Sequence, residues 1–475
     1  MIFRLAFYIS WGCVAVLCLA FATPAGKYSV SHIRPVVDTL PRDQVMAAVA
    51  CGADQNISYS LYLPPAPGKS CPVVILFDPH GNGLLPVNLY RIVAKQFGFA
   101  LVGSNNSRNG NDWQQTQQIF DRLLEDITHR LPVDAGRIIV CGFSGGGKVA
   151  SFLALTSQRV FAAVAMGAAL PDLAASNPQK PLVMVVGRDD MNLTDMLAIS
   201  GPLQQASSHT ALLLFQGKHE WAPADIFESA LAFLESESWR SRRSMLNETA
   251  LRISLLSLQQ RMRSAEQRND LLAVEREGVF AAAMLTGISQ KADSFRRVAS
   301  EIGLRQDYRR QSNSWQEQLR AERAIKDEFA RHFQVGDEAY WLNKIPATKR
   351  NAALQTAAGE MNRRLLAYLS LAFYSISNQM IRDGRYVQAE FFVDQYKSVD
   401  PQNSEAWYFS ALVNARRNQK TRTEADLSRA IEFGLRDISR VRGEPLFQHL
   451  GIDFSQMEQL IRNYSGSHSA KTNKP

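Results

Sequence analysis

Three places in this sequence carry side chains that together could activate a nucleophile. Ser144 lies in the turn Gly142-Phe143-Ser144-Gly145-Gly146, between an apolar run and a helical pattern. Two adjacent acids, Asp189 and Asp190, follow a later apolar run, and His219 follows the last one. A serine hydroxyl is a poor nucleophile until a base takes its proton and a carboxylate orients that base. The order serine, acid, histidine therefore predicts acyl transfer, with Ser144 as the nucleophile and His219 as its base.

The turn at Ser144 also predicts how a negatively charged intermediate would be held. Small residues let the chain pass sharply from a strand to a helix, which lifts the hydroxyl above the sheet edge. Gly145 would then offer its backbone N–H to the oxyanion at a helix N-terminus. A second N–H is expected from the loop after residues 73–77, where Asn82 is the first choice and Gly81 the next. His80 is expected to organise this loop and not to act as a base.

The same segment resembles a phosphate-binding loop, but one residue argues against that function. Residues 142–148 match the spacing Gly-x-x-x-x-Gly-Lys. A phosphate-binding loop needs Ser or Thr after the lysine to hold magnesium, and here that residue is Val149. We therefore expect no nucleotide. The acyl-transfer mechanism implies no metal and no organic cofactor.

Short apolar runs alternate with helical stretches through the first half of the chain. This alternation predicts an α/β fold, a mostly parallel sheet with helices on both faces. The expected strands are residues 45–50, 59–63, 73–77, 100–103, 137–141, 161–166, 182–186 and 211–215. The expected helices are residues 87–96, 113–130, 147–156 and 224–234.

Several motifs within residues 45–240 resemble those of exported bacterial α/β hydrolases of the esterase or peptidase type. The motifs are residues 59–64, 77–81, 104–110, 142–146, 187–192 and 217–223. The resemblance implies an α/β-hydrolase fold and a triad of Ser144, Asp190 and His219. It selects Asp190 because the family's acid lies three residues after a glycine and two before an asparagine. Lys218 departs from the pattern, in which glycine precedes the histidine, and this leaves the shape of that loop open.

The spacing of the site residues bears on the substrate. Asp190 lies only 46 positions after Ser144, and a helix, a strand and a connection occupy the chain between them. This leaves no room for a large lid, so we expect an open cleft suited to bulky ester substrates, with peptides as the alternative. Asn106 and Arg108 would line the cleft unless their loop is a self-satisfied polar turn. Trp221 would form a substrate wall unless it packs beneath its own loop.

After Trp239 the sequence becomes poor in proline and follows a helical period. Near its end, positions 389, 393 and 396 are matched 34 residues later, a period that resembles the tetratricopeptide repeat. Two unrelated helical hairpins are the alternative. We expect these repeats to bind a peptide or protein partner, or to control access to Ser144. The alternative to an enzyme is a catalytically idle scaffold that acts through the repeats. The expected domains are residues 27–238 (α/β hydrolase), 239–364 (helical), 365–464 (repeats) and 465–475 (disordered tail).

The N-terminus predicts that the chain is exported. One arginine precedes the uncharged run from Leu5 to Ala22, and residues 20–22 are Ala-Phe-Ala, as in a cleaved signal peptide. The alternative is an uncleaved anchor, the only way in which we expect contact with a membrane. Either form places the chain outside the cytoplasm, in the periplasm or secreted. Outside the cytoplasm, Cys51 and Cys71 could form a disulfide, whereas Cys141 is predicted to be a buried apolar residue.

The composition limits the remaining function classes. Hydrophobic residues make up 46% of the chain, so a large core is possible and global disorder is excluded. The formal net charge is +8, which is modest for 475 residues and fits an arginine-rich helical surface. No basic run is interleaved with aromatic residues, and we expect no binding of nucleic acid.

Overall fold

The computed structural model describes residues 40–65, 70–170, 172–173 and 180–469, which form two compact units. The first unit ends at Gln316 and the second begins at Glu317. The predicted signal peptide, residues 1–22, lies outside the described residues. Within the described part of the chain, no helix is both long enough and apolar enough to cross a membrane.

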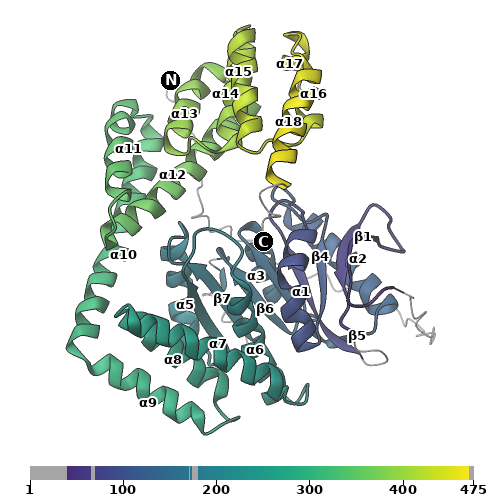
Figure 1. Ribbon diagram of the computed structural model, residues 1–475, viewed down its shortest axis with the longest axis vertical. Coiled ribbons are helices and arrows are strands. Elements are labelled where there is room, and N and C mark those ends of the chain that lie inside the picture. Colours follow the sequence, from purple (N-terminus) through teal and green to yellow (C-terminus); the bar gives the residue numbers. More distant parts are fainter. Residues whose placement is uncertain (1–39, 66–69, 171, 174–179, 470–475) are drawn as a thin grey trace, which may run out of the picture. The chain divides into compact units, whose positions relative to one another are not determined.

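A single eight-stranded sheet forms the centre of the first unit (Figure 1). Its strand order is β1-β2-β4-β3-β5-β6-β7-β8. β2 is antiparallel to both β1 and β4, and every later pairing is parallel. The strands are β1 (Val45–Ala50), β2 (Ser58–Tyr62), β3 (Cys71–Phe77), β4 (Ala100–Ser104), β5 (Val133–Phe143), β6 (Ala162–Met166), β7 (Leu182–Gly187) and β8 (Thr210–Phe215). The predicted mostly parallel α/β sheet is confirmed.

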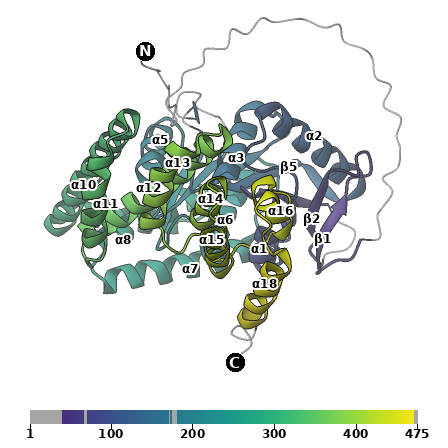
Figure 2. The ribbon, with the colours of Figure 1, turned by 90° about the horizontal axis from the view of Figure 1, so that it is seen from above.

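Helices cover both faces of this sheet, as Figure 2 shows from above. α2, α3 and α5 lie on one side, and α1, α6 and α7 on the other. Successive residues of a strand point to opposite faces, so strands such as β3, which is buried at every position, need this double cover. The helices are α1 (Leu84–Phe97), α2 (Trp113–Arg130), α3 (Gly145–Thr156), α5 (Leu193–Ala206), α6 (Ala224–Arg240), α7 (Glu248–Gln267), α8 (Leu271–Leu285) and α9 (Lys291–Leu304).

The first unit continues beyond residue 238, where the sequence analysis ends the hydrolase domain. α7 and α8 belong to the same hydrophobic core as the sheet and α6. Leu258 of α7 and Phe280 of α8 are buried in it together with Phe233 of α6. These helices follow an ordinary amphipathic pattern in the sequence, and that pattern does not say which surface they cover.

The second unit is helical throughout its described residues. α11 packs on α12, α12 on α13, α13 on α14 and α14 on α15. Positions 389, 393 and 396 of α13 and positions 423, 427 and 430 of α15, which the repeat aligns, are all buried. α18 continues through residues 465–469, which the sequence analysis assigned to a disordered tail; residues 470–475 lie outside the described residues. The helices are α11 (Glu338–Ala352), α12 (Ala357–Arg382), α13 (Tyr386–Val399), α14 (Ser404–Arg416), α15 (Lys420–Glu432), α16 (Ile438–Arg442), α17 (Pro445–His449) and α18 (Phe454–Ser469); α10 (Gln306–Val335) runs across the boundary between the units.

The pairing of Cys51 with Cys71, which the sequence left open, does not occur, because both are free thiols. Cys51 directly follows β1, and Cys71 begins β3. β2 and β4 lie between these two strands, which places them three strand spacings apart, about 14 Å. A disulfide requires Cα atoms within about 7 Å of each other. The two cysteines flank one strand in the sequence, but the sheet order separates them in space.

Candidate active site

Ser144 occupies the sharp turn between β5 and α3. Its backbone has φ 54° and ψ −120°, a conformation that costs energy for any residue with a side chain. The turn is tight enough to exclude side chains from its neighbours: a methyl group on Gly142 would collide with the carbonyl of Gly146, and one on Gly146 with the carbonyl of Phe77. The strain at Ser144 is therefore imposed by close packing on both sides, which fixes where its hydroxyl points.

Ser144, His219 and Asp190 form a continuous chain of hydrogen bonds. The Ser144 Oγ lies 2.9 Å from His219 Nε2. His219 Nδ1 lies 3.0 Å from both carboxylate oxygens of Asp190. Asp190 follows β7 and His219 follows β8, and these strands are parallel neighbours, so both loops leave the same edge of the sheet. The structure thus brings together the three residues that the sequence analysis selected.

Asp190 is held in place as the partner of His219. Its side chain is 1% exposed, whereas that of His219 is 18% exposed. Asn192 donates its backbone N–H to Asp190 Oδ1 over 2.8 Å and its side-chain amide to the carbonyl of Gly167 over 2.8 Å. A buried carboxylate favours the tautomer in which Nδ1 carries the proton, leaving Nε2 free to accept one from Ser144.

The loop that carries His219 accommodates Lys218 without strain. Lys218 keeps a negative φ, so this position does not require glycine. Its backbone N–H donates to the Glu220 carboxylate over 3.0 Å, which closes the turn locally. The departure from the family pattern therefore leaves His219 within reach of both partners.

The two candidates for the second oxyanion donor differ in how fully their N–H groups are used. Gly81 donates its N–H to the carbonyl of Asp78 over 3.1 Å. Asn82 has a contact of only 3.4 Å, to Asp78 Oδ1. An oxyanion can recruit a weakly bonded N–H more cheaply than one in a good hydrogen bond. This difference favours Asn82, the first choice from the sequence, alongside Gly145 at the start of α3.

Asp78 is a residue that the sequence analysis missed. Its carboxylate is buried and accepts the backbone N–H of His80 over 2.8 Å, the longer contact from Asn82, and the indole N–H of Trp221 over 3.0 Å. It therefore ties the loop after β3 to the loop that carries His219. Asp78 lies in the motif of residues 77–81 and directly after a buried strand, but neither feature assigned a role to its side chain.

Two of the residues predicted to line the substrate cleft, Asn106 and Trp221, form hydrogen bonds and packing contacts within the protein. Asn106 accepts the N–H of Ser58 and donates to the carbonyl of Asn56, each over 2.8 Å, so its side chain organises its own surroundings. Trp221 packs edge-on to Tyr90, at 5.9 Å between ring centres, as well as bonding to Asp78. Asn106 thus ties its loop to residues 56–58, and Trp221 packs against α1 and bonds to the loop after β3.

His80 and Arg108 are exposed. The loop of Arg108 lies beside Gly81, a candidate oxyanion donor, because the Arg108 Cβ would lie 3.6 Å from a methyl group placed on Gly81. The next residue, Asn109, lies against the turn at Ser144, because a methyl group on Gly145 would collide with the Asn109 side-chain amide. Sequence reasoning did not single out Asn109, since one amide in a polar loop carries no signal of its own.

The described residues hold no group of three or more His, Cys, Asp or Glu side chains that could bind a metal ion.

The eight-stranded sheet order, the strained serine between β5 and α3, and the acid and histidine after β7 and β8 occur together in one unit. The first unit has an α/β-hydrolase fold.

Comparisons with known proteins find similarity to solved structures over part of the chain. No model of a known protein family and no curated protein matches the chain. Solved structures similar to its N-terminal part include a peptidase, a hydrolase and an esterase. They include the Pyrococcus horikoshii acylaminoacyl peptidase (14% identity, TM-score 0.27, 34% of this chain and 35% of that one), the S-formylglutathione hydrolase from Staphylococcus aureus (14%, 0.31, 38% and 89%) and Est1E from Butyrivibrio proteoclasticus (13%, 0.32, 42% and 99%).

The matched region spans about a third of the length of the acylaminoacyl peptidase. At these identities and TM-scores the likeness supports no conclusion about activity or substrate.

Proposed function

We propose that the first unit is a serine hydrolase that cleaves carboxylic esters through an acyl-enzyme intermediate. The observation that carries this proposal is the chain of hydrogen bonds from Ser144 through His219 to Asp190, at 2.9 and 3.0 Å. Such a chain supplies a nucleophile, a base and an orienting carboxylate in contact with one another. The strained backbone of Ser144 supports the same function, because strain of this kind collects at active sites.

The proposed reaction has two steps. Ser144 Oγ attacks the ester carbonyl carbon while His219 Nε2 takes its proton, and Asp190 stabilises the resulting imidazolium. The N–H groups of Gly145 and Asn82 hold the negatively charged oxygen, a contribution worth about 10²–10³ in rate per donor in related chemistry. The intermediate then collapses, and His219 gives its proton to the departing alcohol. Water, activated by His219, releases the acid from Ser144.

Labelling by a fluorophosphonate probe tests this proposal on the full chain. We expect one covalent adduct, at Ser144, that forms slowly or not at all in the variant His219→Ala. His129→Ala and Ser208→Ala, at exposed positions on α2 and after α5, should label as fast as the unchanged protein. Absence of labelling in the folded protein, or labelling that His219→Ala leaves unchanged, would favour the idle scaffold instead.

A serine peptidase is the alternative within the same chemistry. Hydrolysis of p-nitrophenyl esters can be compared with that of aminoacyl p-nitroanilides under the same conditions. Ester hydrolysis that disappears in Ser144→Ala supports the esterase. Cleavage of the anilides alone would establish a peptidase.

We also propose that the second unit binds a peptide or protein through tetratricopeptide-like repeats. The matched buried positions of α13 and α15 support this proposal. Leu371 and Val387 are 47% and 75% exposed and offer apolar contact area. The double variant Leu371→Glu, Val387→Glu should lose proteins that the full chain captures from its host, whereas Leu342→Glu, at another exposed leucine, should retain them. Equal capture by all three chains would contradict this role.

Export of the chain remains part of the proposal, and it rests on residues 1–22. Removal of the predicted signal peptide during expression in a bacterial host would leave a mature N-terminus close to residue 23. N-terminal sequencing of protein from the periplasmic fraction tests this directly. Recovery of a chain beginning at Met1 in the cytoplasm would contradict export.

A further inference from the structure

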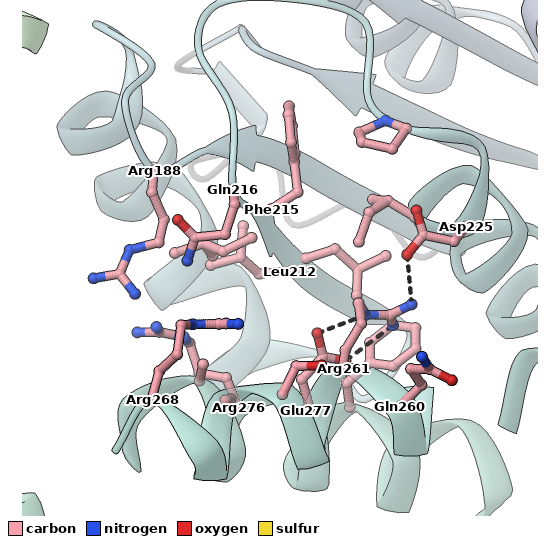
Figure 3. Close-up of a pocket in the computed structure, with 18 residues that line it drawn as sticks. Arg188, Leu212, Phe215, Gln216, Asp225, Gln260, Arg261, Arg268, Arg276 and Glu277 are labelled. Atoms are coloured by element: carbon pink, nitrogen blue, oxygen red, sulfur yellow. Dashed lines mark hydrogen bonds and ion pairs between the residues drawn. The ribbon is translucent and has the colours of Figure 1, made fainter. Parts of the chain in front are cut away.

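A second pocket in the first unit lies outside the candidate active site. Its volume is about 290 Å³, at the small end of the range for ligand pockets. It lies between the end of β8 and the helices α7 and α8 (Figure 3). Neither Ser144, Asp190 nor His219 lines it. It is nevertheless close to their loops along the chain, because Arg188 and Gln216, which line it, follow β7 and β8 directly.

The inner wall of this pocket is apolar. Phe215 of β8, Ile226 of α6 and Phe280 of α8 line it and are almost fully buried. The rim is polar and open to solvent at Gln216 and Gln260. A ligand that suits both parts has an apolar body and a polar end.

Four arginines line the pocket, and only some have acidic partners. Arg261 is satisfied by two contacts to Glu277, at 2.9 and 3.0 Å, and one to Asp225, at 3.3 Å. Arg188 pairs with Asp270. The guanidinium groups of Arg268 and Arg276 form no hydrogen bond and no ion pair with any residue that the structure describes, although that of Arg276 lies over an aromatic ring. Figure 3 shows the guanidinium groups of Arg188, Arg268 and Arg276 on the same side of the pocket, away from the Arg261 group. Positive charge is therefore in excess at one end.

Arg276 is the most unusual of these groups. Burial lowers the pKa of its guanidinium, and the like charge of Arg188 lowers it further, while Asp270 and Glu275 act in the opposite direction. Its guanidinium and that of Arg188 both lie over the ring of Trp315, at 5.8 and 5.3 Å from its centre. A half-buried cation without an ion pair is costly to maintain, and a bound anion would remove that cost.

We propose that this pocket binds a small amphiphilic anion. Its carboxylate or phosphate group would lie among Arg188, Arg268 and Arg276, since guanidinium groups match the geometry of both anions. Its apolar body would lie against Phe215 and Phe280. Trp315 holds two of the guanidinium groups in place, so the end of the pocket that would receive the anion is already formed before a ligand arrives.

Isothermal titration of the full chain tests this proposal with four probes. Octanoate and octyl phosphate carry both features, octanol lacks the charge, and inorganic phosphate lacks the apolar body. We expect at least one of the two octyl anions to bind at least tenfold more tightly than octanol and inorganic phosphate. The preferred anion then identifies the head group. No binding by either octyl anion, or equal binding by octanol or by phosphate alone, would overturn the proposal.

Two variants locate the site. Arg276→Gln and Arg268→Gln should each weaken binding of the preferred anion about tenfold or more, and Arg268 is exposed, so its variant should fold even if the other does not. Arg263→Gln, at an exposed position on α7, the helix that ends just before Arg268, lies outside the pocket; it is the matched control and should bind normally. Unchanged affinity in the Arg268 variant would overturn the proposed site. Because binding is measured directly, a failure here leaves the proposed hydrolase activity untouched.

Discussion

At the scale of single residues, Asp78 connects the two halves of the candidate active site. Its carboxylate accepts hydrogen bonds from the loop after β3 and from Trp221 beside His219. Asp78→Asn keeps the volume but turns one acceptor into a donor, which leaves either Trp221 or the loop without its partner. We expect kcat for p-nitrophenyl ester hydrolysis to fall about 10–100-fold with little change in KM, since misplaced catalytic groups affect the chemical step.

Trp221→Phe is the matched control for this positioning role. It keeps an aromatic ring against Tyr90 but removes the indole N–H, so it should reproduce part of the loss in kcat. A role in stability alone would lower the melting temperature of both variants and leave kcat unchanged at a temperature where they are folded. That outcome would contradict positioning by Asp78.

The residues found from the sequence differ in kind from those it missed. Ser144, Asp190 and His219 each end an apolar run, and parallel strands bring such positions to one sheet edge, so their meeting could be predicted. Asp78 was missed, and Asn106 was expected to line the cleft. The hydrogen bonds of both side chains join loops far apart in the chain. No local pattern encodes those partners, and only the folded loops reveal them.

At the scale of elements, the strand-to-helix turn at Ser144 depends on close backbone contact. A side chain on Gly146 would collide with the carbonyl of Phe77, so Gly146→Ala should push α3 away from β3. We expect a loss of about 2–3 kcal/mol of stability in denaturant unfolding, comparable with other overpacked sites. Gly303→Ala is the control, since nothing lies within 4 Å of the added methyl near the end of α9, and it should keep the stability or raise it by up to about 1 kcal/mol. If the Gly146→Ala variant kept the free energy of unfolding of the unchanged protein, the turn at Ser144 would be able to adjust to the added methyl group.

α5 also shows where sequence patterns stop being informative. The eight expected strands all occur, whereas no helix was expected at residues 193–206. Gly201 and Pro202 interrupt its pattern, and both residues usually disfavour a helix interior. Packing against β7 and β8 forms the helix despite them.

The separation of β1 from β3 predicts how the cysteines react. Cys51, Cys71 and Cys141 should each take up one iodoacetamide after unfolding without reductant, as mass spectrometry would show. In the native state they should resist alkylation at pH 8, because all three are buried and burial raises the pKa of Cys51 to about 11.

The same pKa has a consequence for stability. Between pH 9 and 11 the unfolded chain loses the Cys51 proton while the folded chain keeps it, so this thiol lowers the free energy of unfolding as pH rises. Cys51→Ala should remove that contribution to the slope in this range. A disulfide detected between Cys51 and Cys71, or rapid native alkylation, would contradict the predicted behaviour.

At the scale of the whole molecule, we expect the first unit to need α7 and α8 in order to fold. A chain ending at residue 240 would expose the surface of α6 that these helices cover, including Phe233. It would also lose Leu258 and Phe280 from the core, and each buried side chain of this size contributes about 1.5–3 kcal/mol. Such losses approach the total stability of an ordinary domain.

A chain ending at Gln316, the limit of the compact unit, should behave differently. It keeps α7 and α8 and retains the contact of Trp315 with Arg188. We expect this chain to unfold cooperatively and to label at Ser144 with fluorophosphonate, while the chain ending at residue 240 aggregates or unfolds without a transition. Circular dichroism and labelling of both chains would measure this. If the shorter chain folded and labelled as well as the longer one, the core shared between the sheet and α7 and α8 would not be needed for the site, and the domain would end near residue 238 as its sequence pattern suggests.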